Sequence, residues 1–168
     1  SERPKPTRSG ATARSPAGCT CRRWRRTNST PLTVMVRCTG LARSLRSVLD
    51  RLGVPSGARV GTFAWNSHRH LELYFGVPCS GRVLHSANVR LHADQVRYAI
   101  DHAGDEVLFV DASLTPALAP LRDRLGVRTY VVMDDGAPID DAFADCPRYE
   151  ELLAEAEPVE ALPELAES

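Results

Sequence analysis

The chain has 168 residues, of which 21 are basic, 21 are acidic and 43% are hydrophobic. This length and composition fit one ordinary domain and exclude a disulfide-stapled mini-protein and a collagen-like fibre. Apolar stretches such as residues 130–133 have the length of strands, and none approaches the roughly 18 residues of a membrane-spanning helix. Because the chain begins with Ser1 and shows no leader, we expect a cytoplasmic protein whose true start could be missing.

The neutral total conceals two different kinds of sequence. Residues 1–40 hold nine Lys or Arg and one acid, a net charge of +8, whereas the remainder holds 12 basic and 20 acidic residues, a net charge of −8. The first forty residues also contain three of the five cysteines and almost no apolar periodicity. Because such a segment cannot bury a face of its own, we expect residues 1–40 to form a disordered arm.

Three interpretations of this arm are open. Its charge suits nucleic-acid binding through phosphate neutralisation. Cys19, Cys21 and Cys38 could be zinc ligands, although the C-x-C spacing is unusual and the arm has no histidine to act as the fourth ligand. The interpretation that we favour is an out-of-frame segment, because 20 Arg against one Lys indicate a GC-rich gene and regular periodicity begins abruptly at Leu41.

From residue 41 onward, helical and strand patterns alternate. Gly53 closes the first helix, Asn66 can cap the second, and Pro78 should end or kink that second helix. The predicted helices cover residues 41–52, 67–77, 93–103 and 116–125, with an acidic surface helix around residues 150–153. The predicted strands cover residues 59–64, 82–85, 106–111 and 128–133.

The regular spacing of these strands predicts the fold class. Each strand begins 22 to 24 positions after the previous one, with one helix in the interval. This spacing is typical of βαβ units, which wind right-handed into a parallel sheet. Strands rich in Val, Leu and Phe without polar alternation indicate a sheet covered by helices on both faces. We therefore predict an α/β unit over residues 41–157, followed by a truncated linker over residues 158–168.

The sequence contains no motif that identifies a nucleotide or metal site. Neither G-x-G-x-x-G nor G-x-x-x-x-G-K-[ST] occurs, and the single lysine is Lys5. His68 and His70 project in different directions on a helix and cannot easily share an ion. We assign structural or surface roles to the histidines as a group. Its members are His68, His70, His85, His92 and His102.

Two further side chains are candidates for function. Cys79 lies in an apolar stretch without a nucleophile elbow around it, so we predict a small core residue. Asp111 ends a strand, which is where α/β enzymes often place functional groups. The alternative for Asp111 is a cap or turn before Ser113. The acidic pairs 134–135 and 140–141 are predicted to be solvated turns rather than cation sites.

A family resemblance rests on two segments. The first runs from Val60 to Pro78 and includes Trp65-Asn66 and His70-Leu71-Glu72, and the second runs from Gly81 to Leu91 and includes His85 and Asn88. Both resemble the N-terminal part of medium- and long-chain fatty acyl-CoA synthetases, which are adenylate-forming, AMP-binding enzymes. The resemblance covers roughly residues 41–157 and implies part of the large N-terminal domain of such an enzyme.

The resemblance also implies an activity. The whole enzyme would join a fatty acid to CoA through an acyl-adenylate, using ATP and Mg²⁺, as a cytoplasmic protein that could associate with a membrane surface or form a homodimer. The phosphate loop and the other catalytic groups of the family would lie beyond Ser168, so we assign no catalytic, cofactor-binding or metal residue here. We expect the fragment itself to bind no cofactor and to be inactive. The alternative is a stand-alone, non-catalytic α/β binding module with a basic nucleic-acid-binding arm.

The second segment departs from the family pattern in two places. Ser86-Ala87 replaces the more usual Thr-Leu. Arg82 stands at a position that relatives usually fill with a small residue. An arginine there is awkward to bury unless its guanidinium reaches water or an acid.

Overall fold

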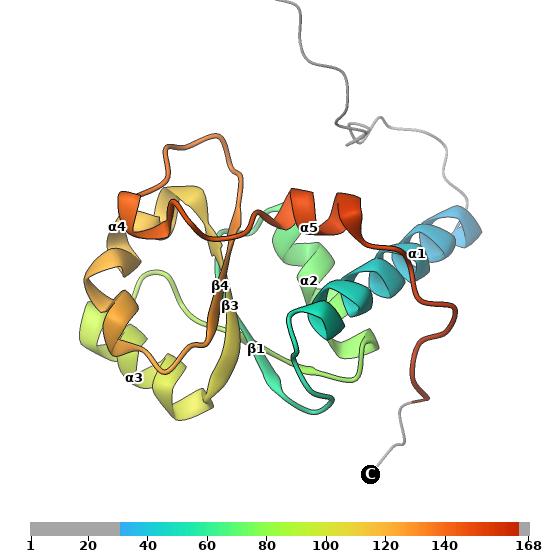
Figure 1. Cartoon of the computed structure of the whole chain (residues 1–168), viewed down its shortest axis with the longest axis horizontal. Helices are drawn as coiled ribbons and strands as arrows, with labels where there is room; N and C mark the ends of the chain where they lie inside the picture. The colour runs from blue at the N-terminus through green and yellow to red at the C-terminus, as the bar shows by residue number, and fades with distance from the viewer. Residues whose placement is uncertain (1–30, 165–168) are drawn as a thin grey trace, which may run out of the picture.

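The computed structural model describes the backbone of residues 31–164 and the side chains from residue 39 to residue 164 (Figure 1). Within this range, the strands form one sheet with the order β2-β1-β3-β4, and all neighbouring strands are parallel. The strands are β1 (Arg59–Phe63), β2 (Val83–Ser86), β3 (Asp105–Asp111) and β4 (Thr129–Met133). The predicted α/β class with a parallel sheet is therefore confirmed.

Helices cover both faces of this sheet. Figure 1 shows α1, α2 and α5 on one side and α3 and α4 on the other. The α-helices are α1 (Pro31–Arg51), α2 (His68–Cys79), α3 (Ala93–Ala103), α4 (Thr115–Leu118) and α5 (Tyr149–Glu155). Short 3-10 helices are η1 (Ala112–Leu114), η2 (Ala119–Arg124) and η3 (Asp141–Phe143). In the described part of the chain, none of the helices is both long and apolar enough to cross a membrane.

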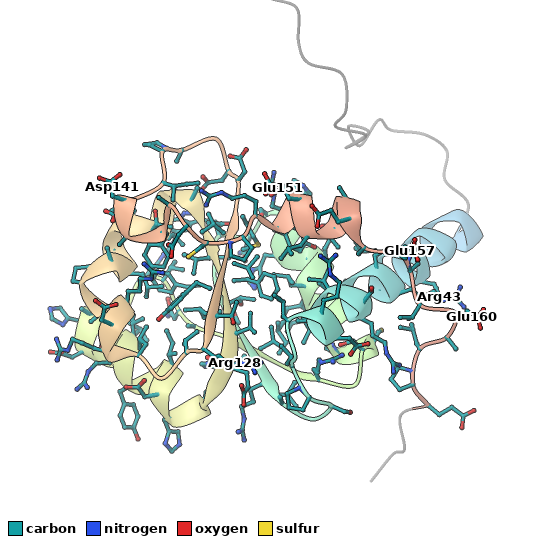
Figure 2. The ribbon with its side chains drawn as sticks, viewed as in Figure 1. Arg43, Arg128, Asp141, Glu151, Glu157 and Glu160 are labelled. Carbon is teal, nitrogen blue, oxygen red and sulfur yellow. The ribbon has the colours of Figure 1, made fainter. Side chains whose placement is uncertain are left out.

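The two faces of β3 belong to two separate hydrophobic cores. Val107 and Phe109 point into one core, which also takes side chains from α1, α2 and α5. Leu108 and Val110 point into the other, together with side chains from α3, α4 and η2. Charged side chains such as those of Arg128, Asp141 and Glu151 lie on the outside (Figure 2). Strands β1, β3 and β4 are thus mostly buried on both faces, as their composition predicts, whereas the edge strand β2 is partly exposed.

Three local predictions differ from the structure. Helix α1 begins at Pro31 and so crosses the boundary that we placed at residue 41. Residues 116–125 form a short α4 followed by the 3-10 helix η2, because Pro120 lacks the N–H that would continue the α-helical pattern. The side chain of Ser67, and not that of Asn66, caps α2. Residues 1–30, with Cys19 and Cys21, and the side chain of Cys38 lie outside the described residues.

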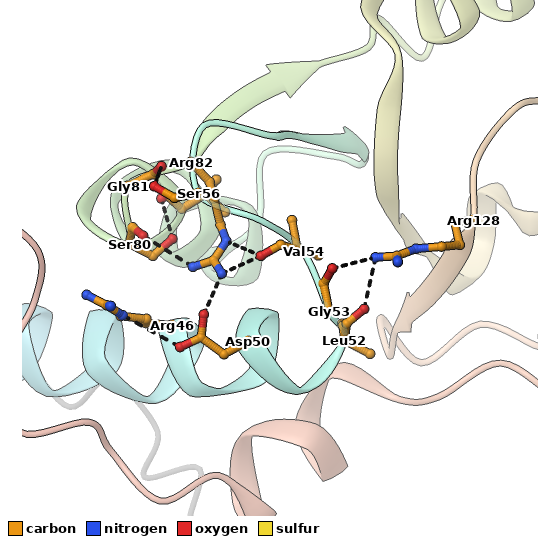
Figure 3. A network of polar contacts seen from close by, with 11 residues as sticks. Arg46, Asp50, Leu52, Gly53, Val54, Ser56, Ser80, Gly81, Arg82 and Arg128 are labelled. Carbon is orange, nitrogen blue, oxygen red and sulfur yellow. Dashed lines mark hydrogen bonds and ion pairs between the residues drawn. The ribbon is translucent and has the colours of Figure 1, made fainter.

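Arg82 is buried, and its guanidinium joins three segments (Figure 3). Its Nη2 donates to Asp50 Oδ1 on α1 and to the carbonyl of Val54, each at 2.5 Å. Its Nε donates to the same carbonyl at 3.1 Å, and its Nη1 donates to the carbonyl of Ser80 at 3.2 Å. The guanidinium of Arg82 therefore reaches an acid, Asp50, as we expected for a buried arginine at this position.

A second arginine holds the same turn from the opposite side. The connection from α1 to β1 begins with the turn at residues 52–54, and Arg128 Nη2 donates to the carbonyls of Leu52 and Gly53 at 3.0 and 2.9 Å (Figure 3). The side chain of Arg128 is half exposed, whereas that of Arg82 is almost fully buried. The turn is thus fixed by one buried and one exposed guanidinium.

These two arginines allow a matched test of burial. We expect Arg82→Met to lower the free energy of unfolding by about 3 kcal/mol, because buried carbonyls and a carboxylate lose their donor. Arg128→Met removes a comparable set of hydrogen bonds in water and should cost less than about 1 kcal/mol. Urea unfolding of the two variants, followed by circular dichroism, measures both. Equal losses of unfolding free energy in the two variants would show that burial of the Arg82 guanidinium does not increase its contribution to stability.

Candidate functional site

The strand order places a switch point at the carboxyl ends of the central strands β1 and β3. We call the region between the loops that follow these two strands the crevice. From β1 the chain passes through α2 to β2 on one flank, whereas from β3 it passes through α4 to β4 on the other flank. The connections that follow the adjacent strands β1 and β3 therefore diverge beyond their carboxyl ends. In open α/β sheets such a switch point is where ligands bind. The candidate site therefore comprises the residues that follow Phe63 and Asp111.

Asp111 ties the two diverging loops together. Its side chain is 1% exposed, and Oδ2 accepts a hydrogen bond of 2.7 Å from the backbone N–H of Trp65. Its Oδ1 is buried and has no hydrogen-bond partner among the described residues. Burial raises the pKa of Asp111, and the bond from Trp65 only partly offsets that rise. Asp111 occupies the cap position of η1 without a side-chain capping bond, so its carboxylate contacts the neighbouring loop instead.

A second set of contacts joins the same loops at the surface. Trp65 Nε1 donates to Ser113 Oγ at 3.1 Å, and the hydroxyl of Ser113 donates to Asp135 Oδ2. The backbone N–H of Ser113 donates to Asp135 Oδ1 at 3.2 Å. Partial burial raises the pKa of Asp135, but hydrogen bonds from Ser113 and Ala137 outweigh it, so the pKa lies below its ordinary value. The turn after β4 is thereby attached to the edge of the crevice.

A shallow hollow of about 360 Å³ opens beside these loops at the start of α2. His70 lies in it, with Nε2 3.2 Å from Thr62 Oγ1 and 3.5 Å from Ser86 Oγ. The ring of His70 also lies edge-on to that of Tyr74, with 6.3 Å between centroids. The hollow thus pairs an imidazole and hydroxyl groups with an apolar rim. Its lining residues are Asn66, Ser67, His70, Leu71 and Tyr74.

His85 belongs to an internal pair rather than to the crevice. Its Nδ1 lies 2.7 Å from Oδ2 of Asp105, whose side chain is fully buried. The pair spans the central strand at Gly61, where an added Cβ would lie 2.6 Å from Asp105 Oδ2. Burial raises the pKa of Asp105, while the hydrogen bond and charge of His85 act in the opposite direction. This geometry supports a structural role for His85.

The other candidate residues have separate surroundings. His92 caps α3 in a capping box with Gln95, and the ring of His102 stacks on that of Tyr98. Across residues 39–164, no group of three or more His, Cys, Asp or Glu side chains is placed to hold a metal ion. The prediction that Cys79 is a core residue is wrong, because its side chain is exposed. Leu73, Gly76 and Val77 are the buried residues of α2, and Cys79 is the last residue of that helix and lies outside this buried set.

Comparison with known proteins identifies the family. The family model described as "AMP-binding enzyme" matches residues 37–164. The chain belongs to this family. A long-chain-fatty-acid–CoA ligase of Thermus thermophilus is 46% identical over 120 residues, which are 70% of this chain and 21% of that enzyme. A 3-methylmercaptopropionyl-CoA ligase of Ruegeria lacuscaerulensis is 42% identical over 116 residues, 67% of this chain and 21% of that enzyme.

Solved structures agree on the fold. A benzoate CoA ligase from Burkholderia xenovorans superposes with a TM-score of 0.65 at 19% identity, over 77% of this chain and 24% of the ligase. The parallel sheet with its helices matches the N-terminal domain of adenylate-forming enzymes. The chain spans about a fifth of the length of the curated relatives that it matches.

The side chains at the ends of β3 and β4 on this side of the sheet are acidic. Phosphate sites in this class of fold use glycine-rich turns, helix N-termini and cationic side chains. The crevice instead presents the carboxylates of Asp111 and Asp135 beside Trp65 and Ser113, and the single lysine, Lys5, lies outside the described residues. On the other flank of the crevice lie the N-terminus of α2 and the cationic or basic side chains of Arg69 and His70, whose charges act on Asp111.

The two carboxylates of the crevice should respond to pH in opposite ways. The pKa of Asp111 is raised above the ordinary 3.8, so its contribution to stability is greatest below that pH and is lost as the pH rises through the folded pKa. Relative to the parent, Asp111→Asn should thus gain stability as the pH rises from acid to neutral. Urea unfolding at a series of pH values measures this slope.

Asp135→Asn is the control for this measurement. The pKa of Asp135 is lowered, so its stabilising contribution is present above 3.8 and is lost as the pH falls through the folded pKa. This variant should therefore lose stability relative to the parent as the pH rises. If the stability of both variants relative to the parent changed in the same direction with pH, the opposite pKa shifts assigned to Asp111 and Asp135 would be contradicted.

Proposed function

We propose that this chain is the N-terminal part of an ATP-dependent fatty acid–CoA ligase. The observation that carries the proposal is the 46% identity with the long-chain-fatty-acid–CoA ligase of Thermus thermophilus, over 120 residues that make up only 21% of that enzyme. The membership of residues 37–164 in the AMP-binding family supports the same assignment. A fatty acid is the proposed acyl substrate, and ATP, Mg²⁺ and CoA are the proposed co-reactants of the whole ligase.

The proposed reaction has two steps. A carboxylate oxygen of the fatty acid bonds to the α-phosphorus of ATP and the bond to pyrophosphate breaks. The thiol of CoA then bonds to the acyl carbon, AMP leaves, and the thiol proton passes to solvent. Because charge accumulates on phosphoryl oxygens, the first step requires cationic or amide donors. We propose that the donors that contact the triphosphate come mainly from parts of the ligase outside this chain.

We propose that this chain holds loops in place for the rest of the ligase and supplies no group that reacts with the substrates. The bond from Trp65 N–H to Asp111 fixes the loop after β1 against the loop after β3. The contact of Ser113 with Asp135 adds the turn after β4. These bonds hold the residues that follow three parallel strands at one edge of the sheet. In an intact ligase, this edge would form a rigid support for the acyl and nucleotide sites.

A chimeric ligase tests the proposal. The segment of the Thermus thermophilus enzyme that aligns with this chain would be replaced by the corresponding residues of this chain. We expect the chimera to catalyse fatty-acid-dependent exchange of pyrophosphate into ATP, because the transplanted scaffold is that of the same family. The 168-residue chain alone should show no exchange above background.

The controls separate folding from activity. Circular dichroism and the melting temperature establish that the chimera is folded. A folded chimera without exchange activity would contradict the proposed function. Exchange by the isolated chain would show that the reacting groups lie within it, and so would contradict the proposed division of labour.

A further inference from the structure

Helix α2 has an apolar stripe on its outer face. Leu71, Tyr74, Phe75 and Pro78 occupy positions i, i+3, i+4 and i+7, which places them on one side of a helix. The first three are 53%, 57% and 57% exposed, and Pro78 is exposed as well. The ring of Tyr74 lies edge-on to that of Phe75, with 6.3 Å between centroids. Large apolar side chains are thus gathered in water rather than scattered.

The opposite face of α2 already packs inside the unit. Leu73, Gly76 and Val77 are buried, and a Cβ at Gly76 would lie 2.5 Å from Leu45 Cδ2 on α1. A helix at the surface of a finished protein needs one apolar face, and a helix that is apolar on both sides is normally covered on both. The outer stripe is therefore suited to burial against something beyond the described residues.

The charges beside the stripe are already engaged within the unit. Arg69 pairs with Glu150 of α5, and Glu72 Oε2 accepts a hydrogen bond of 3.0 Å from Tyr149 Oη. These contacts direct the neighbouring cation and carboxylate toward α5. The chemistry that fits the stripe is consequently an apolar protein surface, and not a phosphate-rich partner.

The sheet edge next to α2 has the same character. In the described residues β2 pairs only with β1, and Val83 on it is 50% exposed. An uncovered edge strand carries unpaired backbone groups that proteins usually cover or blunt. At the other end of α2, Leu71 and Tyr74 also line the hollow around His70. The stripe is therefore part of a larger uncovered surface that also includes the edge of β2 and the hollow around His70.

We propose that the α2 stripe, comprising Leu71, Tyr74, Phe75 and Pro78, is the surface on which the remaining part of the acyl-CoA ligase packs. This inference rests on the proposed function. The curated relatives match over only 21% of their length, so a much larger body has to pack against this unit in a complete enzyme. The occupant is thus a part of the same ligase with an apolar face, rather than a second copy of this chain.

Cysteine accessibility in the chain and in the chimeric ligase tests this surface. Tyr74→Cys places a thiol in the stripe, and Tyr98→Cys places one on the exposed side of α3, where Tyr98 is 68% exposed. Maleimide labelling is followed at each peptide by mass spectrometry, so the native cysteines do not interfere. We expect Tyr74→Cys to react rapidly in the chain alone and on the order of tenfold more slowly in the chimera. Tyr98→Cys should react at similar rates in both.

The outcomes distinguish this inference from the function on which it rests. An active chimera in which Tyr74→Cys still reacts as fast as in the chain alone would overturn the docking surface and leave the ligase assignment intact. A folded but inactive chimera would contradict the ligase assignment, and the docking inference with it. Slow labelling of Tyr74→Cys in the chain alone, together with a dimer in sedimentation, would identify a second copy as the occupant and overturn the inference.

Substitution of the stripe provides a second measurement. Phe75→Asp replaces an exposed ring, so we expect the melting temperature of the chain alone to change little. In the chimera the same change would bury a charge, and the melting temperature should fall. Equal, small effects in both settings would also overturn the docking surface.

Discussion

The need to cover both faces of β1 and β3 determines most of this structure. These two strands lie side by side at the centre of a parallel sheet and expose almost no side chain to water. Because parallel neighbours require crossover connections, the chain places α2 on one face and α3 and α4 on the other. Because all these crossovers are right-handed, a crossover on one face leads to a strand on one side, and a crossover on the other face leads to a strand on the opposite side. The chain therefore moves from β1 to β2 in one direction and from β3 to β4 in the other. The crevice between the loops after β1 and β3 is therefore a geometric result of covering the core.

Local chemistry made much of the fold predictable. The strands were predictable because each is a short apolar run between helical patterns, and Gly104 ends α3 in the left-handed conformation that glycine favours. Two predictions were wrong for a shared reason. Pro120 was read as part of a continuous helix and Cys79 as a core residue, because apolar spacing alone identifies a helix without showing where it is interrupted or which way it faces.

The candidate site was less predictable, because it depends on strand order. The position of Asp111 at a strand end is visible in the sequence, but its partner, Trp65, lies 46 residues earlier. Those two residues meet only because β3 lies beside β1, and periodicity does not specify which strands are neighbours. The contact of Ser113 with Asp135 depends in the same way on β4 lying beside β3. Arg82 was the exception, since a buried guanidinium is expected to reach water or an acid, and it reaches Asp50.

The contacts of Trp65 make the crevice optically observable. The sequence contains only two tryptophans, and the other one, Trp24, lies outside the described residues. The indole N–H of Trp65 donates a hydrogen bond to the hydroxyl of Ser113, and its backbone N–H donates one to the carboxylate of Asp111. Trp65 is also partly exposed to water. With Trp24 replaced by phenylalanine and with excitation at a wavelength that tyrosine does not absorb, the fluorescence of the chain would come from a single indole that contacts both loops. Its emission wavelength and its quenching by solutes would then report directly when the loops separate or when a molecule covers the indole.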